Sequence, residues 1–425
     1  MSDERKDDGT EDLRTFLSSQ NVQFGSISCM RIPGPAQRGI VATADIQPNE
    51  MLLSVPKNIL MGVQSAREDK SIAQALVVSL KNGLHLSDQQ LLAIHLLREC
   101  SKGSESFWFP YISTIPRSYS TGFSMSDEHI EEVQFPYAKR ILYEAREECM
   151  ESYAAAQAVL HLLFEKKSKW SSFRAWQWAL STLSSRTMYM PESSIGVLCP
   201  YGDLHNYMWP PPPITMSLAS NVPDDDMTGA QEGTMSGEGY FDATRDMYIL
   251  VSRRMYSIGD EVCLCYGRHT NIHLLRHYGF CLENNPHNTV PIPVAHFPDK
   301  VHQYLHSEDD ALLHNNGYPS FELMRSLRLA SLDSNDRKRY AFKVLNDESV
   351  DVSSEITAFS MLMKAVERTL DESSTTIETD RRILSEISDT DACMYAVISF
   401  RLYQKNVLSR CLNICQRYMH TLTRM

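Results

Sequence analysis

Segments with the character of β-strands occur in only two short parts of this chain, and a long helical stretch separates them. The first part is residues 38–56, where short apolar runs at 40–41 and 51–55 flank a turn that contains Pro48, which predicts two strands. The second part holds two candidate strands, residues 247–252 and 261–266, joined by a turn at Gly259. This distribution predicts an α+β fold in which helices are inserted between two β-rich pieces.

The remaining chain is mostly helical by its apolar spacing. Residues 65–185 form the predicted helical insertion, and Ser87-Asp-Gln-Gln90 is a capping box that starts one of its helices. From about residue 300 onward, apolar residues again recur at three- and four-residue spacing, which predicts helices at 357–370, 377–387 and 392–418. A run of four prolines at 210–213, three aspartates at 224–226 and a Gly/Ser/Thr-rich run to Gly239 together predict a long loop.

These patterns predict three parts. The acidic N-terminus predicts a solvated tail, with the flexible region extending to about residue 22. Residues 23–290 form the predicted β-rich domain with its insertion, and residues 291–425 form an all-helical domain. The chain has 425 residues, which is enough for two or three domains.

Composition excludes several classes of protein. Lys and Arg total 41 and Asp and Glu total 53, so the formal net charge of −12 argues against direct nucleic-acid binding. The acidic N-terminus is not a secretory signal, and no stretch of eighteen apolar residues predicts a membrane helix. None of the ten cysteines forms a CxxC pair, which favours a reducing compartment over a disulfide or zinc framework. We therefore expect a cytoplasmic or nuclear protein.

An ordered set of motifs lies between Trp178 and Asn288. These are Ser185-Arg186, Asp203-x-x-Asn206-Tyr207, Glu261-Val-x-x-x-Tyr266-Gly267 and Asn271-x-x-Leu-Leu-x-x-Tyr278-Gly279. Together they resemble the SET domain of the Rubisco large-subunit methyltransferase family, in its plant SET-domain-group branch. The resemblance extends over residues 25–418, through a Gly-rich turn at 39–46, Phe-Trp-x-Pro-Tyr at 107–111 and the helix around 398–402.

Two positions depart from the family's pattern. The family's Asn-His pair is Asn206-Tyr207 in this chain. The acidic residue that usually precedes the first Gly-rich turn is replaced by Ala36 or Gln37. Both changes keep open the alternative of a catalytically weak or inactive SET-fold module that binds protein.

The resemblance implies a protein-lysine N-methyltransferase that uses S-adenosylmethionine and acts on a histone or non-histone protein. The helical C-terminal domain would hold the substrate protein, and we expect a monomer that needs no metal. The family also contains a histidine methylator, so the acceptor side chain stays open. Methyl transfer to an amine requires an aligned donor and acceptor, and a neutral nitrogen whose pKa a dry channel can lower.

The resemblance also implies roles for individual residues. Tyr266 would lie at the methyl-transfer channel, supported by Tyr278, and Asn206 would contact the amino-acid end of the cofactor. The backbone of Tyr207 would lie near the adenine. Ser185 and Arg186 would bind the carboxylate of the cofactor, and Asp203 would brace that arrangement. The first turn would approach the cofactor closely through Arg38, Gly39 and Ile40.

Three of these residues, and two further pairs of residues, also have an ordinary structural interpretation. Tyr266 could be a core aromatic, Arg186 could neutralise a helix C-terminus, and Asn206 could be a turn residue. Cys263 and Cys265 are interpreted as small core residues. The spacing of His273 and His277 could bind a metal on a helix, but without a third ligand a packing or surface role is favoured.

Overall fold

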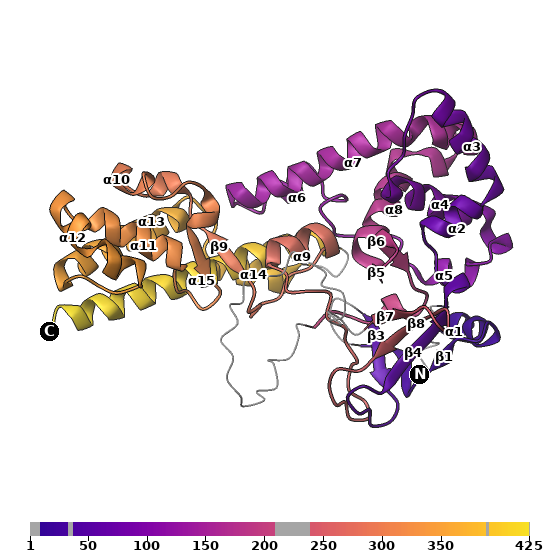
Figure 1. The fold of residues 1–425 in the computed structure, drawn as a ribbon, viewed down its shortest axis with the longest axis horizontal. Coiled ribbons are helices and arrows are strands. Elements are labelled where there is room, and N and C mark those ends of the chain that lie inside the picture. Colours follow the sequence, from indigo (N-terminus) through magenta and orange to yellow (C-terminus); the bar gives the residue numbers. More distant parts are fainter. Residues whose placement is uncertain (1–8, 33–36, 209–238, 388–390, 425) are drawn as a thin grey trace. The chain divides into compact units, whose positions relative to one another are not determined.

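A computed structural model describes residues 9–32, 37–208, 239–387 and 391–424. The described chain forms two compact units (Figure 1). Unit 1 contains the chain up to Tyr119 together with Arg146–Arg268, and unit 2 contains Ser120–Ala145 together with the chain from His269 onward. The units therefore divide at residue 268 and not at the predicted 290, and part of the predicted insertion belongs with the C-terminal helices. The predicted loop at 210–239 lies, except for its last residue, outside the described residues, as does Ala36.

The largest sheet of unit 1 joins the two β-rich parts of the sequence. Its four strands are antiparallel neighbours in the order β1 (Gln23–Phe24), β4 (Met51–Pro56), β8 (Met247–Val251) and β7 (Gly239–Asp242). Val55 of β4 lies opposite Tyr248 of β8, and both side chains are buried. The predicted strands at 51–55 and 247–252 are thus confirmed. They lie about 190 residues apart, and their pairing places both β-rich parts of the sequence in one sheet.

Two hairpins complete the β-structure of unit 1. Strand β2 (Ile27–Arg31) pairs with β3 (Arg38–Ala42), and β5 (Thr187–Met190) pairs with β6 (Ser193–Leu198). The prediction of a strand at 261–266 is wrong, because this segment makes only isolated bridges. Val41 bridges to Glu261 and Tyr207 bridges to Leu264, so the pairing partner changes within four residues and no ladder forms. The predicted turn before it is confirmed, with Gly259 at φ 90°.

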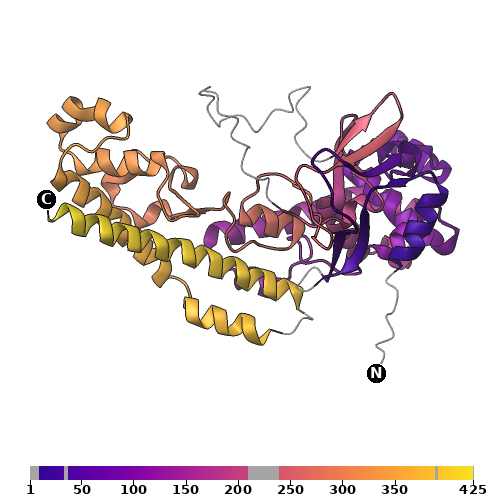
Figure 2. The same ribbon diagram turned by 90° about the horizontal axis from the view of Figure 1, so that it is seen from below.

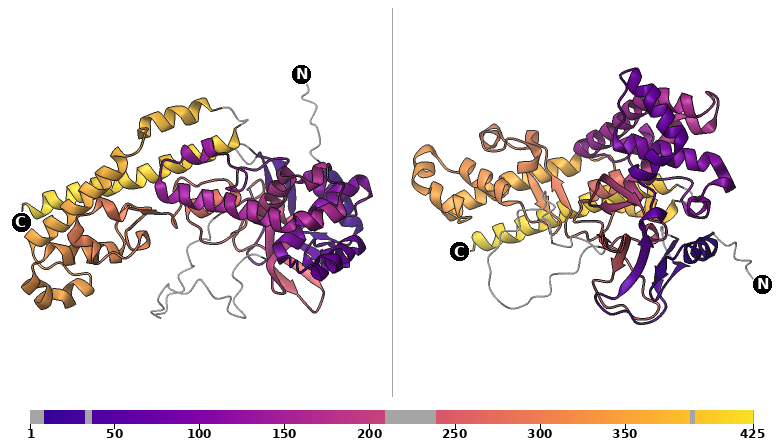
Figure 3. Two further views of the ribbon diagram at one scale, coloured as in Figure 1. Left: turned by 90° about the horizontal axis from the view of Figure 1, so that it is seen from above. Right: turned by 45° about the vertical axis from the view of Figure 1, so that its right-hand side comes forward.

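The helices of unit 1 largely confirm the predicted insertion. The capping box at Ser87 is present, with Gln90 N donating to Ser87 Oγ at 3.2 Å and Ser87 N donating to Gln90 Oε1 at 2.8 Å. Helices α4 and α8 pack on each other, and Figure 3 shows this helical group from two sides. The helical elements are α1 (Thr10–Ser19), α2 (Val63–Glu68), α3 (Lys70–Lys81), α4 (Asp88–Lys102), α5 (Phe109–Thr114), α8 (Phe173–Arg186), the later part of α7 (Pro136–Leu163), and the 3-10 helices η1 (Lys57–Ile59), η2 (Gly103–Glu105), η3 (Lys169–Ser171) and η4 (Gly202–Leu204).

Helix α1 corrects the prediction of a flexible tail over residues 1–22. Leu13 and Leu17 lie one helical turn apart and are both fully buried. Arg14 Nη1 donates to the Ile27 carbonyl at 3.0 Å and to the Tyr201 hydroxyl at 3.1 Å. Two acidic residues, Glu11 and Asp12, lie in the first turn of the helix, where they stabilise its N-terminus.

Unit 2 is predominantly helical, and the predicted helices at 357–370, 377–387 and 392–418 are confirmed. The longest helix packs against the two that precede it in the sequence, as Figure 2 shows in yellow and orange. The described part of the chain has no helix long and apolar enough to cross a membrane. The elements of unit 2 are α6 (Asp127–Glu131), the start of α7, α9 (Asn271–Tyr278), β9 (Thr289–Pro291), η5 (Val294–His296), α10 (Asp299–His302), η6 (Glu308–Asp310), β10 (Leu312–His314), α11 (Phe321–Ser331), α12 (Ser334–Leu345), α13 (Val352–Asp371), α14 (Ile377–Glu386) and α15 (Ala392–Leu422).

A buried ionic cluster joins α14 to α15. Asp380 of α14 is fully buried, and its Oδ1 accepts from Arg401 Nε at 2.9 Å while its Oδ2 accepts from Lys405 Nζ at 2.8 Å. Arg401 also donates to the Glu132 carbonyl at 2.9 Å, and Lys405 donates to the Thr375 carbonyl at 2.7 Å. Burial lowers the pKa of Lys405, and Asp380 opposes that change. The cluster thus fixes α15 to three other segments of unit 2.

Candidate active site

The side-chain amide of Asn206 connects three segments of unit 1. Asn206 follows η4, and its Nδ2 donates to the Arg38 carbonyl oxygen at 3.0 Å and to Glu261 Oε1 at 2.7 Å. A Cβ atom on residue 39 would lie 2.7 Å from Glu261 Oε1 and 2.8 Å from Asn206 Nδ2. These two side chains can therefore meet beside the hairpin only because residue 39 is glycine. The first hairpin, the segment after η4 and the extended segment at 261–266 therefore converge here.

Two tyrosines lie together next to this convergence. The Tyr266 hydroxyl donates to the carbonyl oxygen of His205. The Tyr207 hydroxyl donates to the Gly267 carbonyl at 2.8 Å, and the ring centroids of Tyr207 and Tyr266 are 5.3 Å apart. The structure thus brings together Asn206, Tyr207 and Tyr266, which the sequence motifs singled out separately.

Arg186 lies at the C-terminus of α8 in a buried cluster with Asp203. Its Nη1 donates to the Asp203 carbonyl at 3.0 Å and to Asp203 Oδ2 at 3.1 Å, and its Nε donates to the Tyr119 hydroxyl at 3.2 Å. The Tyr111 hydroxyl donates to the same carboxylate oxygen at 2.8 Å. Burial opposes the charged guanidinium, but Asp203 and the two tyrosines outweigh it and raise the pKa of Arg186. Asp203 thus braces Arg186.

The other three predicted residues of unit 1 are Arg38, Ile40 and Ser185, and their contacts are structural ones within unit 1. The Ser185 hydroxyl donates to a carbonyl one turn earlier in α8 at 2.7 Å, and no hydrogen bond among the described residues joins it to the Arg186 cluster. Ile40 is fully buried, and its carbonyl accepts from the Val262 amide at 2.7 Å. The Arg38 guanidinium donates to the Thr114 carbonyl. The Ile40 carbonyl and the Arg38 guanidinium therefore hold the hairpin against residues 262 and 114.

Tyr278 belongs to unit 2 and ends helix α9. Its ring centroid lies 6.1 Å from that of His269 and 6.2 Å from that of Phe280. Gly279 caps the helix with φ 78° in the left-handed region. Because Tyr266 belongs to unit 1, a pocket shared by the two tyrosines stays a prediction.

Four residues of this site were assigned no role from the sequence, and three of them lie within the motifs. Glu261 is an acidic residue at the start of an otherwise apolar segment. A charged side chain in such a segment needs a polar partner, and this could have marked Glu261 as a site residue. Tyr111 ends the Phe-Trp-x-Pro-Tyr motif, and this motif carries no information about the hydrogen-bond partner of the tyrosine. No sequence signal distinguishes Tyr119 or His205, whose contacts depend on residues distant in the chain or on a backbone carbonyl.

We expect His205 to make unit 1 less stable in acid. Its Nδ1 lies 2.9 Å from the Gly202 carbonyl, and burial lowers its pKa from 6.5 to about 4. As pH falls from about 6.5 toward 4, the unfolded chain takes up a proton that the folded chain resists, so stability falls in that window. Urea unfolding at pH 7.5 and pH 5 should show a smaller loss in His205→Leu than in the parent. Equal losses would contradict this assignment.

The comparisons with known proteins agree with this geometry. A model of the Rubisco LSMT substrate-binding family matches residues 295–408. The chain is 32% identical over 371 residues to Protein SET DOMAIN GROUP 40 of Arabidopsis thaliana, covering 85% of this chain and 74% of that protein. It is 25% identical over 401 residues to actin-histidine N-methyltransferase of Mus musculus, covering 88% of this chain and 62% of that protein.

Solved structures support the same fold. The structure of Rubisco LSMT bound to sinefungin and monomethyllysine matches with a TM-score of 0.65 and 19% identity, covering 99% of this chain and 94% of that one. Rubisco LSMT bound to AdoMet matches with a TM-score of 0.63 and 20% identity, covering 98% and 93%. The predicted α+β fold, with a SET domain and a helical C-terminal domain, is confirmed. The chain belongs to the Rubisco LSMT-like SET-domain protein methyltransferases.

Proposed function

We propose that this protein is an S-adenosylmethionine-dependent protein-lysine N-methyltransferase that acts on a histone or non-histone protein. The observation that carries the proposal is the tyrosine pair beside the Asn206–Glu261 hydrogen bond, with the Tyr266 hydroxyl held by the His205 carbonyl. Further support comes from the family and from solved structures of Rubisco LSMT, one bound to AdoMet and two bound to AdoHcy with lysine or methyllysine.

Two polar atoms of the site suit the amino-acid end of S-adenosylmethionine. Arg186 Nη2 has no hydrogen bond to any described residue, and the side chain is 15% exposed, so this nitrogen can bind a carboxylate. The two Nδ2 hydrogens of Asn206 are used, and its Oδ1 has no partner in the described part of the chain, which leaves an acceptor for an ammonium group. When bound, the cofactor supplies a methyl group that its sulfonium makes electrophilic.

The hydroxyl of Tyr266 acts as an acceptor toward the substrate. Its proton is directed to the His205 carbonyl, so the phenol oxygen presents lone pairs to an incoming amine. An acceptor that holds an amine N–H leaves the nitrogen lone pair free for attack. Burial of a lysine side chain beside two aromatic rings would lower its pKa and favour the neutral nucleophile.

Tyr207 replaces the family's His without removing the contacts on which the site depends. Its backbone bridges to Leu264, its ring packs against Tyr266, and its hydroxyl bonds to Gly267. These contacts favour the active enzyme over the alternative of an inactive binding module. The monomeric state, the cytoplasmic or nuclear location and the lack of direct nucleic-acid binding stay predictions.

Gly39→Ala is expected to weaken S-adenosylmethionine binding about tenfold, because a site loosened by a fraction of an ångström loses its aligned contacts. The added Cβ would displace the Glu261 carboxylate and the Asn206 amide, which are ends of side chains that can move, so the fold should persist. Calorimetry would measure the affinity and circular dichroism the fold. Unchanged affinity in a folded variant would contradict the role of Gly39.

The acceptor residue is tested by labelling. The purified protein is incubated with a cell lysate and methyl-labelled S-adenosylmethionine, and mass spectrometry locates the label, with Asn206→Ala as the control enzyme. Methyl-lysine that the control does not produce is the expected result. Methyl-histidine would favour the activity named for the actin-histidine relatives, and label on neither residue would favour the binding module.

A further inference from the structure

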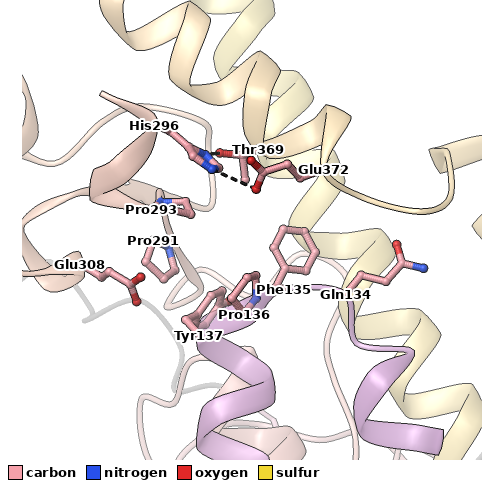
Figure 4. Close-up of a pocket in the computed structure, with 10 residues that line it drawn as sticks. All are labelled: Gln134, Phe135, Pro136, Tyr137, Pro291, Pro293, His296, Glu308, Thr369 and Glu372. Atoms are coloured by element: carbon pink, nitrogen blue, oxygen red, sulfur yellow. Dashed lines mark hydrogen bonds and ion pairs between the residues drawn. The ribbon is translucent and has the colours of Figure 1, made fainter. Parts of the chain in front are cut away.

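Unit 2 contains a cavity of about 90 Å³ that shares no residue with the candidate active site. Figure 4 shows its side chains arranged around a hollow between the start of α7, the segment 291–296 and the end of α13. The residues that line it are Gln134, Phe135, Pro136, Tyr137, Pro291, Pro293, His296, Glu308, Thr369 and Glu372.

The volume restricts the ligand to a small head group. It is larger than a single water molecule needs, and smaller than the roughly 150 Å³ of an engineered cavity that holds benzene. Complete cofactors and drug-sized ligands need cavities of about 300 Å³ or more. The head group that fits therefore has only a few non-hydrogen atoms.

Most of the wall is apolar and aromatic. Phe135 and Tyr137 are 2% and 8% exposed, and three prolines contribute the rest of the apolar surface. The Tyr137 hydroxyl is buried and has no hydrogen-bond partner among the described residues. Burial raises the pKa of Tyr137, so the hydroxyl stays neutral, and a ligand N–H would supply the partner that it lacks.

The charges in the wall favour a cation. Glu308 and Glu372 both line the cavity, and His296 lies with its Nε2 3.0 Å from Glu372 Oε2 and its Nδ1 2.8 Å from Thr369 Oγ1. Two arginines pair with these carboxylates from outside the wall, Arg140 at 3.8 Å and Arg368 at 3.2 Å, and both pairs are largely exposed and therefore weak. The N-terminus of α7 alone would attract an anion, but the carboxylates of Glu308 and Glu372 would repel it.

We propose that this cavity binds an alkylammonium head group, with the methylated lysine side chain of a protein as its source. Aromatic rings attract such cations through their faces, and flanking carboxylates add charge attraction. The ammonium chemistry rests on the cavity alone, whereas the choice of methyl-lysine as the source rests on the proposed function.

The test is calorimetric titration of the full chain with choline and with 3,3-dimethylbutan-1-ol, which has the same shape without the charge. We expect saturable choline binding and at least about tenfold weaker binding of the alcohol. Phe135→Leu removes one ring and Glu308→Gln one charge, and each should weaken choline about fivefold or more. Glu322→Gln, an exposed glutamate on α11 outside the cavity, is the matched control and should change nothing. Glu308 is partly exposed, so its variant reports on the site even if the Phe135 variant does not fold.

Titration with N-acetyl-trimethyllysine methylamide then identifies the source. Binding at least as tight as that of choline, and lost in Glu308→Gln, supports methyl-lysine, while tighter choline binding would overturn that source. Equal binding of choline and the alcohol, no binding of either, or competition by inorganic phosphate would overturn the cation site. Titration of Glu308→Gln with S-adenosylmethionine separates the two proposals, because cofactor binding should be unchanged whether or not the cavity binds ammonium.

Discussion

Replacing Tyr266 with Phe should lower kcat about a hundredfold while leaving the Kd of S-adenosylmethionine within about twofold, since a slightly misplaced reactant costs about that much rate. The variant keeps the ring that packs against Tyr207 at 5.3 Å and loses only the hydroxyl bonded to the His205 carbonyl. That hydroxyl is the acceptor proposed to orient the amine. Initial rates with the identified substrate and calorimetry with the cofactor measure the two quantities.

The control for this variant is Tyr189→Phe. Tyr189 lies on β5 of the same unit and is 61% exposed, so the loss of its hydroxyl should alter neither quantity. A Tyr266→Phe enzyme with the parent's turnover would remove Tyr266 from the mechanism. A variant that loses cofactor affinity in proportion to its rate would instead make Tyr266 a cofactor-binding residue.

Asp380→Asn should destabilise unit 2 by about 3–5 kcal/mol, the usual cost of leaving a buried charge without its partner. The substitution keeps the shape of the side chain but removes the charge that faces both Arg401 and Lys405, whose side chains are 1% exposed. Two cations would then share a buried site whose remaining carboxylate, Glu132, is 45% exposed. Amide hydrogen exchange of α14 and α15, followed by mass spectrometry, measures the loss in this unit specifically.

Glu386→Gln is the matched control on the same helix. It removes an ion pair with Arg382 in which the two side chains are 60% and 65% exposed, so the exchange rates should change little. Equal exchange in the parent and in Asp380→Asn would mean that the cluster contributes no stability. An increase confined to the last turn of α14 would mean that Asp380 holds only its own helix.

The sequence predicted helices better than sheet pairing. A capping box located α4, and apolar spacing located α13, α14 and α15, because a helix is determined by neighbours within four residues. The pairing of β4 with β8 joins residues nearly 200 positions apart, and no local pattern specifies it. The segment 261–266 has the composition of a strand, but it has one bridge to β3 and another to residue 207, so it forms no ladder.

The N-terminal helix shows the converse error. Residues 10–19 were expected to continue the N-terminal tail, but Leu13 and Leu17 are completely buried within unit 1. Two apolar residues four apart are a weak signal in an acidic segment. Tertiary packing therefore decided the outcome, as it does for many short helices.

The site was predictable only in part. The motifs identified Asn206, Tyr207 and Tyr266, and the structure places them together in unit 1. The partner of Asn206, Glu261, is 55 positions away, and only the folded chain shows that Gly39 must lack a side chain for the two to meet. Arg186 was predicted to bind a carboxylate, and its Nη1 holds the carboxylate of Asp203 within the protein.

The most direct test of the account is calorimetric titration of the purified protein with S-adenosylmethionine, with Asn206→Ala as the test variant. Asn58→Ala is the matched control, because Asn58 is an exposed residue of η1 in the same unit. The account predicts saturable binding to the parent and to Asn58→Ala, and binding at least about tenfold weaker to Asn206→Ala. Absence of binding to the parent, or equal binding to Asn206→Ala, would contradict a cofactor site centred on Asn206.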